Sequence, residues 1–231
     1  MKRMDIRTYN YKTEPYEHQT ETLTRSAHKN LYALFLEMGL GKSKILLDNA
    51  GILFEQGKIT GLLIVTPKGN LRNWDTHEIS KHLPDQIERN VLVWQPNHTQ
   101  RWTQDYEKMV KEDSDGVLNI FLVNVEAFAT VRACTFVEEF LVTHDVMMAV
   151  DESTTIKNPK AKRTKHLIKL APLADYRRIL TGFPITKAPL DLYSQCYFLS
   201  PNLLGFSSYY AFSARYAITQ ARRMGAHSFQ Q

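Results

Sequence analysis

Cysteine is scarce in this chain of 231 residues, which contains only Cys134 and Cys196. The two residues form no CxxC pair and have no histidine at the spacing of a zinc ligand set, so the sequence favours neither a disulfide framework nor a structural zinc site. The eight histidines also lie at no metal-ligand spacing. We therefore expect two unpaired thiols in a reducing compartment.

Long hydrophobic runs are also missing. The longest, such as residues 31–36 and 146–150, hold five or six residues, whereas a helix that spans a bilayer needs roughly 18. Residues 1–15 carry positive charge, but no apolar segment follows them, so they do not resemble a signal peptide. These absences predict an intracellular protein that does not bind a membrane.

Acidic residues become rare in the last third of the chain. Residues 1–156 contain 17 Lys and Arg against 22 Asp and Glu, whereas residues 157–231 contain 12 against 2. The net charge of +5 therefore conceals an acidic first part and a strongly basic end. A surface that meets a polyanion would carry such charge. A solvated helix face would carry it too, so both interpretations stay open.

What the sequence does contain is an alternation of apolar runs with helix-length segments, without an internal repeat or linker in the first 200 residues. Continuous apolar runs of this kind predict a three-layer α/β fold, in which helices cover both faces of a mainly parallel sheet. The expected strands are residues 32–36, 62–66, 91–94, 118–123, 146–150 and 178–181. The expected helices are residues 19–28, 42–55, 71–81, 103–111 and 189–199. No clear strand is expected after residue 200.

A glycine-rich loop, residues 37–43, follows the first apolar run directly and precedes a helix. In a phosphate loop the glycines let backbone amides point at the phosphates, and the helix N-terminus adds its dipole. Lys42 would then reach the β- and γ-phosphates, and Ser43 would offer its hydroxyl to Mg²⁺. The strict pattern has an earlier glycine at the position of Leu36.

Two adjacent acidic residues, Asp151 and Glu152, end the apolar run 146–150. Ligands bind at the C-terminal ends of strands in open α/β sheets. Phosphoryl transfer to water needs a carboxylate that holds Mg²⁺ and a second group that positions the nucleophile. We assign Asp151 to the metal and Glu152 to the attacking water, which predicts nucleotide hydrolysis.

Further motifs stand in the order found in one family. They are Pro-Tyr-Glu-His-Gln at 15–19, Met-Gly-Leu-Gly-Lys-Ser at 38–43, Val-Thr-Pro-Lys at 65–68 with Asn-Trp at 73–74, Lys-Asn-Pro at 157–159 after the acidic pair, and Leu-Thr-Gly-Phe-Pro at 180–184. Over residues 14–205 the chain resembles the SWI/SNF-like ATPases of helicase superfamily 2, which are DNA translocases of the chromatin-remodeller type and their compact bacterial and phage relatives. Ser153-Thr154 replaces the family's Ala-His, and Phe183 replaces a threonine.

The resemblance implies a RecA-like P-loop NTPase lobe over residues 1–204 and the start of a connector over residues 205–231. It implies ATP and Mg²⁺ as cofactors, with double-stranded DNA and a second RecA-like lobe outside this chain as partners. We expect a monomer in the cytoplasm of a bacterial or phage-infected cell, or in the nucleus if the source is eukaryotic. Trp74 is expected to anchor its helix in the core, as a Trp at a helical apolar position usually does.

The residues to which the resemblance and the motifs assign a role fall into four groups. Nucleotide binding is assigned to Gln19, whose amide would read the adenine edge, and to Met38, Gly39, Leu40, Gly41, Lys42 and Ser43. Catalysis is assigned to Lys42 and Glu152, and Mg²⁺ binding to Ser43 and Asp151. DNA binding is assigned to Thr66, Pro67 and Lys68, and the coupling of nucleotide state to DNA to Thr181 and Gly182.

The predicted function is a DNA-stimulated ATPase that moves along duplex DNA. Two alternatives remain: the ATPase lobe of a restriction or packaging motor, and a nucleotide-dependent DNA-binding module without turnover. In the family, arginine fingers come from a Gln-x-x-Gly-Arg-x-x-Arg motif in the second lobe, and this sequence contains no such string. We therefore expect this chain alone to bind ATP weakly and to hydrolyse it poorly.

Overall fold

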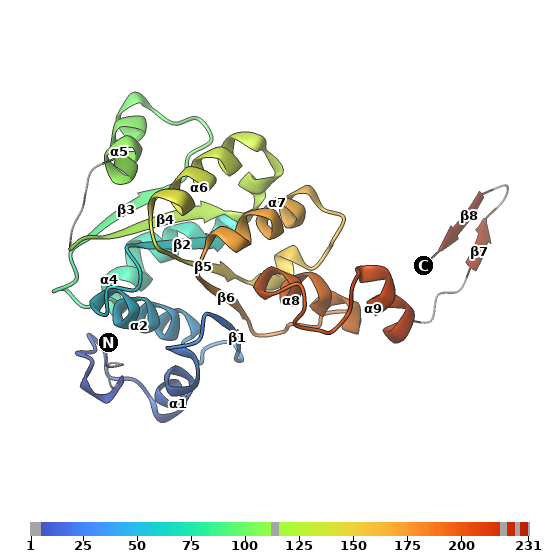
Figure 1. Cartoon of the computed structure of the whole chain (residues 1–231), viewed down its shortest axis with the longest axis horizontal. Helices are drawn as coiled ribbons and strands as arrows, with labels where there is room; N and C mark the ends of the chain where they lie inside the picture. The colour runs from blue at the N-terminus through green and yellow to red at the C-terminus, as the bar shows by residue number, and fades with distance from the viewer. Residues whose placement is uncertain (1–5, 112–115, 218–220, 225–226, 231) are drawn as a thin grey trace.

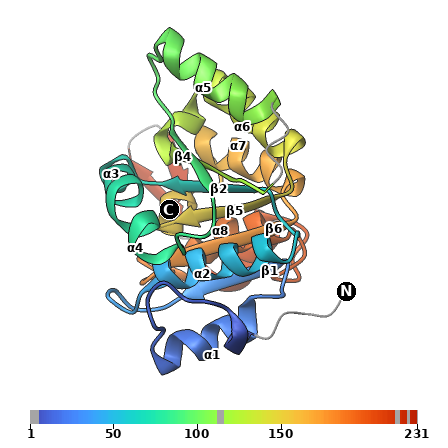
Figure 2. The ribbon, with the colours of Figure 1, turned by 90° about the vertical axis from the view of Figure 1, so that its left-hand side faces the viewer.

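The computed structural model describes residues 6–111, 116–217, 221–224 and 227–230, and its centre is a six-stranded sheet (Figure 1). The strand order is β1-β6-β5-β2-β4-β3, and every pair is parallel. In Figure 2 strands β4, β2, β5, β6 and β1 follow one another from top to bottom. The strands are β1 (Leu31–Phe35), β2 (Gly61–Thr66), β3 (Arg89–Val93), β4 (Leu118–Asn124), β5 (Val146–Asp151) and β6 (Tyr176–Thr181). The six predicted runs are therefore confirmed to within two residues at each end.

Helices cover both faces of the sheet, which confirms the three-layer α/β prediction. Successive residues of β2 point to opposite faces: Leu62 and Ile64 pack with α1, α2 and α4, whereas Leu63 and Val65 pack with α5 to α8. The helices are α1 (Glu17–Ser26), α2 (Lys42–Glu55), α3 (Leu71–Asn73), α4 (Ile79–His82), α5 (Gln100–Lys111), α6 (Val131–Thr143), α7 (Lys162–Leu170), α8 (Leu192–Leu199) and α9 (Tyr209–Tyr216). None of these described helices has the length and apolar character needed to cross a membrane.

The predicted helix over residues 71–81 is interrupted in the structure. A π-helical turn over residues 74–78 separates α3 from α4. A π turn accommodates one more residue than an α turn, and the hydrophobic pattern does not reveal that extra residue. The Nδ2 of Asn73 donates to the Oε1 of Glu78, five residues later, across this turn at 3.0 Å.

Three other parts of the chain differ from the expected elements, and one of them is helix α7, which is absent from the expected helices. Helix α6 was not predicted, although its buried side chains Ala133, Val137, Phe140 and Leu141 follow helical spacing. After residue 200 the structure contains helix α9 and two short antiparallel strands, β7 (Ala221–Met224) and β8 (His227–Gln230), where no strand was expected. The short polar and basic sequence of β7 lacks the apolar alternation by which strands are recognised.

One fully buried charge ties β6 to the helices beneath it. The guanidinium of Arg178 donates through Nη1 to the carbonyl oxygen of Asn30 at 2.9 Å, and through Nη2 to those of Lys29 at 2.7 Å and Ser26 at 3.3 Å. Its Nε donates to the Oδ1 of Asn49 on α2 at 3.0 Å. Burial lowers the pKa of Arg178 to about 10, so the side chain stays charged at neutral pH. Two of these carbonyl oxygens also accept a backbone bond, Ser26 from Lys29 at 3.0 Å and Asn30 from Arg177 at 2.7 Å, and Arg178 adds a charged donor near the negative end of the α1 dipole.

We predict that Arg178→Met lowers the free energy of unfolding by about 3 kcal/mol, because the Oδ1 of buried Asn49 and three backbone carbonyl oxygens lose a charged donor at once. The control is Arg25→Met on the surface of α1, where Arg25 pairs only with exposed Glu21. Such exposed pairs contribute about 1 kcal/mol or less. Urea unfolding of both variants measures the difference, and equal midpoints would contradict the role given to Arg178.

Candidate nucleotide-binding site

The parallel register of the sheet brings four chain segments to one edge. Because Val65 of β2 pairs with Val150 of β5, Thr66 lies beside Asp151. Because Asp151 pairs with Leu180 of β6, Glu152 lies beside Thr181. Strand β1 pairs with β6 on the far side, so the loop that follows β1 starts at the same edge. The glycine-rich loop, the acidic pair and the start of the Leu-Thr-Gly motif therefore converge.

The glycine-rich loop has the backbone of an anion-binding turn. Gly39 and Gly41 have φ values of 83° and 75°, in the left-handed region that favours glycine, and α2 begins directly after them. The free amides at the start of α2 and its dipole attract negative charge. The Nζ of Lys42 lies over the loop and donates to the carbonyl oxygens of Leu36 at 3.0 Å and Glu37 at 3.2 Å.

A cavity of about 440 Å³ lies between this loop, the acidic pair and the π turn. Seven of its lining residues carry a predicted role: Met38, Gly39, Gly41, Lys42, Ser43, Asp151 and Glu152. The sequence did not assign the other six lining residues to the nucleotide site: Asn70, Asn73, Trp74, Glu78, Lys81 and His82. Most of the unpredicted residues come from the π turn and α4, so the interruption of that helix decides which side chains reach the cavity.

Asp151 is held at the cavity wall by donors from two other elements. Its Oδ2 accepts from the hydroxyl of Thr66 at 2.8 Å and from the indole Nε1 of Trp74 at 3.0 Å, while its Oδ1 accepts from the backbone of Glu152 at 3.0 Å. Two donors saturate Oδ2, so Oδ1 keeps the remaining acceptor capacity. The carboxylate is therefore fixed in one orientation.

These contacts correct one prediction and extend another. Thr66 was predicted to contact DNA, but its side chain is fully buried because β2 is a central strand, and its hydroxyl belongs to Asp151. Trp74 is buried, as predicted, and in addition bonds to Asp151, which the sequence did not indicate. Pro67 is half-buried and Lys68 is exposed at the end of β2, and their contact with DNA stays a prediction.

Glu152 has a left-handed backbone, with φ 47° and ψ 57°, which is unusual for a residue with a side chain. Such strain costs about 1–3 kcal/mol and is concentrated at functional sites. Burial and the charge of Asp151 raise the pKa of Glu152, while Lys42 and Thr181 oppose the rise. The hydroxyl of Thr181 donates to its Oε2 at 3.4 Å. The acidic pair therefore holds two carboxylates in different environments.

Thr181 and Gly182 lie against the other parts of the site. Thr181 is buried beside Glu152, and a Cβ at Gly182 would lie 3.4 Å from the backbone nitrogen of Met38 in the glycine-rich loop. This segment therefore contacts both the acidic pair and the glycine-rich loop. The coupling of nucleotide state to DNA that was assigned to it stays a prediction.

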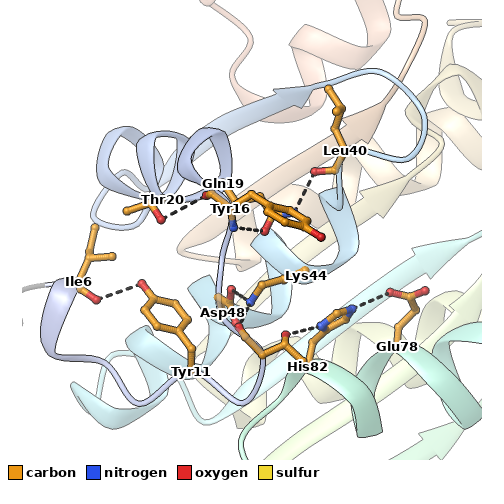
Figure 3. A network of polar contacts seen from close by, with 11 residues as sticks. Ile6, Tyr11, Tyr16, Gln19, Thr20, Leu40, Lys44, Asp48, Glu78 and His82 are labelled. Carbon is orange, nitrogen blue, oxygen red and sulfur yellow. Dashed lines mark hydrogen bonds and ion pairs between the residues drawn. The ribbon is translucent and has the colours of Figure 1, made fainter.

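Gln19 and Leu40 lie beside the cavity and bond to each other. The Nε2 of Gln19 donates to the carbonyl oxygen of Leu40 at 3.2 Å, and its Oε1 accepts from the backbone of Tyr16 at 3.0 Å (Figure 3). Gly41 makes room for this amide, because a Cβ there would lie 2.3 Å from the Nε2. The two bonds fix which end of the amide is the acceptor, and the adenine contact of Gln19 stays a prediction.

The oxygen atoms of the site fit a hard cation. Among the described residues there is no cluster of three or more His, Cys, Asp or Glu that could enclose a metal ion. Mg²⁺ does not need one, since it keeps several waters and binds one or two protein oxygens together with phosphates. The Ser43 hydroxyl and the Asp151 carboxylate, which line one cavity, are such oxygens.

The two loop glycines make a matched pair for a test. Ala at either position must adopt a left-handed backbone, which costs about 1 kcal/mol, but only Gly41→Ala also collides with Gln19, since no atom lies within 4 Å of a Cβ at Gly39. We predict that Gly41→Ala lowers the melting temperature clearly more than Gly39→Ala. Calorimetry without nucleotide measures this, and equal shifts would contradict the close packing of Gln19.

A second test compares two indole hydrogen bonds, one in the site and one away from it. Trp74→Phe removes a donor from buried Asp151, whereas Trp102→Phe removes one from the carbonyl oxygen of Val93 at the opposite face of the sheet. We predict that each variant loses about 1 kcal/mol of stability. Only Trp74→Phe should require more Mg²⁺ for half-maximal nucleotide binding, and an equal Mg²⁺ requirement in the two variants would refute the positioning of Asp151 by Trp74.

Comparison with known proteins gives one family. The profile of the SNF2-related domain matches residues 18–229. The ISWI chromatin-remodeling complex ATPase ISW1 of Saccharomyces cerevisiae is 27% identical over 197 residues, which cover 84% of this chain and 16% of that protein. The chromatin remodeling factor mit1 of Schizosaccharomyces pombe is 27% identical over 165 residues, which cover 71% of this chain and 11% of that protein.

A solved structure agrees with these relatives. The SWI2/SNF2 ATPase core of Sulfolobus solfataricus in complex with dsDNA superimposes with a TM-score of 0.69 at 25% identity, over 93% of this chain and 41% of that one. The chain thus spans only 11–16% of these two curated relatives and less than half of the solved neighbour. With the match over residues 18–229, the chain belongs to the family of SNF2-related domains.

Proposed function

We propose that this chain is the ATP-binding lobe of a DNA-dependent ATPase that moves along double-stranded DNA. The observation that carries the proposal is the convergence of the glycine-rich loop and both acidic residues on one cavity, in a member of the SNF2-related family. ISW1 is named an ATPase, and the solved neighbour is an ATPase core bound to dsDNA. These relatives support ATP and duplex DNA as the ligands.

The chain's own groups suit a nucleoside triphosphate. The amides at the start of α2 and the ammonium of Lys42 would bind the phosphates. Gln19 keeps one acceptor site on Oε1 and one hydrogen on Nε2, which complement the N6 donor and N7 acceptor of adenine. Guanine has two acceptors at the corresponding positions, so its O6 would oppose Oε1. The fixed amide therefore favours adenine.

The acidic pair suits hydrolysis. Ser43 and Asp151 would hold Mg²⁺, which supplies charge neutralisation at the phosphates when it is bound. The raised pKa of Glu152 makes this carboxylate a better proton acceptor than an exposed one, and Glu152 would orient and deprotonate the attacking water. Thr181, which donates to Glu152, would keep the carboxylate in place.

The DNA-facing surface is proposed from exposed residues. Pro67 and Lys68 end β2, and exposed Lys160, Lys162 and Lys165 lie on or just before α7. Lys157 contributes less positive charge to this surface, because it pairs with Asp191 at 3.3 Å and donates to Thr186. The rate-accelerating arginines, which contribute about 10³ to 10⁵ in related phosphoryl transfers, would come from a second lobe.

Glu152→Gln tests the assignment of hydrolysis. We expect the variant to bind Mg²⁺-ATP within about twofold of the unchanged chain, because the phosphate contacts remain, and single-turnover hydrolysis to fall by about 10² or more. Lys42→Ala is the control that should lose binding itself. Measurable hydrolysis that is unchanged in Glu152→Gln would contradict the catalytic role, whereas no hydrolysis by the unchanged chain in a long single-turnover incubation would favour a binding module without turnover.

Steady-state ATPase of the chain alone, with and without duplex DNA, tests the need for the second lobe. We expect little turnover in both conditions. Brisk turnover of the lone chain on addition of DNA would refute the dependence on arginines from elsewhere.

A further inference from the structure

A buried ion pair lies behind the glycine-rich loop. Lys44 and Asp48, one turn apart on α2, are joined by an Nζ–Oδ2 contact of 2.7 Å and are almost completely excluded from solvent (Figure 3). Burial raises the pKa of Asp48 to about 6, against the effect of Lys44. A buried pair of charges is a costly arrangement that adds little net stability over apolar residues. We therefore look for the role of this ion pair in the contacts that Lys44 makes with other parts of the chain.

Those contacts reach the N-terminal segment that precedes α1. The Nζ of Lys44 donates to the carbonyl oxygen of Thr13 at 2.6 Å, and it lies 5.3 Å from the ring centroid of Tyr11, within the range of a cation–π contact. Asp48 keeps the ammonium oriented between its own helix and this segment. Lys44 thus anchors the backbone of Thr13 to the same helix whose first residue is Lys42.

Thr13 has a second anchor on α4. Its hydroxyl lies 2.8 Å from the Nδ1 of His82, whose Nε2 lies 3.8 Å from the Oε2 of Glu78 (Figure 3). The facing carboxylate favours the proton on Nε2, so Nδ1 accepts from the threonine hydroxyl. Burial lowers the pKa of His82, which supports the neutral ring. Both His82 and Glu78 line the cavity.

The anchored segment leads directly to the Gln19 amide. Three residues after Thr13, the backbone N–H of Tyr16 donates to the Oε1 of Gln19, while the Nε2 donates to Leu40 in the glycine-rich loop. The amide therefore spans two segments, and its orientation depends on their relative position. If the segment moves, the bond to Tyr16 weakens, and the amide can rotate to present Nε2 where Oε1 was.

We propose that Lys44 and His82 are positioning residues that set the preference for adenine over guanine, because they hold Thr13 and thereby keep the Oε1 of Gln19 toward the base. This inference rests on the proposed function, since it needs a nucleotide in the cavity. Lys44 lies outside the residues that line the cavity, whereas His82 lines its wall. They change the ratio of the affinities for adenine and guanine nucleotides and leave the binding of the phosphates unchanged.

The test variant replaces the ion pair without leaving a buried charge. Lys44→Met combined with Asp48→Leu puts apolar groups of similar size at both positions, which buried ion pairs commonly tolerate, and removes the donor to Thr13. Lys111→Met combined with Glu107→Leu is the matched control, because it removes an exposed ion pair of the same spacing on α5, at the opposite face of the sheet. Thr13→Val removes the hydroxyl that bonds to His82, without altering the ion pair or a residue that lines the cavity.

The measured quantities are the dissociation constants of Mg²⁺-ATP, Mg²⁺-GTP and inorganic tripolyphosphate, with thermal melting as the check of the fold. We expect the unchanged chain and the control on α5 to prefer ATP. In the double variant of Lys44 and Asp48 and in Thr13→Val, the preference should fall by about fivefold or more, as expected for the loss of one oriented hydrogen bond. Tripolyphosphate affinity should stay within about twofold.

Two results would overturn the inference alone. One is an unchanged ATP preference in Thr13→Val and in the folded double variant; the other is an equal loss of tripolyphosphate affinity, which would show a general disturbance of the loop. If the double variant fails to fold, Thr13→Val still decides the outcome. The proposed function, and the inference with it, would be overturned if the unchanged chain bound neither nucleotide nor tripolyphosphate. It would also be overturned if Lys42→Ala had no effect on binding.

Discussion

The parallel pairing of β5 with β2 and β6 is the constraint on which the rest of the site depends. It sets Thr66 beside Asp151 and Thr181 beside Glu152, and it brings the loop after β1 to the same edge through β6. A slip of one residue would turn each of these side chains to the opposite face of the sheet. The apolar cores on both faces oppose such a slip, so hydrophobic packing fixes the geometry of a polar site.

Buried charged side chains hold together elements that the hydrogen bonds of the sheet do not join. Arg178 connects β6 to the end of α1, Lys44 connects α2 to the segment before α1, and Asp151 connects β5 to the π turn. In each case the charge is satisfied by groups from more than one element. The cost of leaving such a charge unpaired therefore opposes separation of the elements. Of the three charges, Asp151 lines the nucleotide cavity, whereas Arg178 and Lys44 lie outside its lining.

The sequence predicted the six strands of the central sheet because each contains an apolar run, and it predicted the glycine-rich loop and the acidic pair because their chemistry requires adjacent residues. It failed where the answer depends on contacts between distant segments. The motif that contains Thr66 gave its position but not the direction of its side chain. No local pattern links Lys44 to Thr13, which precedes it by 31 residues. The N–H of Trp74 found its acceptor 77 residues away.

The π turn over residues 74–78 carries a consequence for how this chain can change over evolution. If the same residues formed an uninterrupted α-helix, the extra residue would rotate everything after it by about 100° around the helix axis. His82 and Lys81 would then leave the cavity wall, although no side chain had been exchanged. The count of residues in this helix is therefore as much a determinant of the pocket as their identity, and relatives of different length there would build the same wall from different positions.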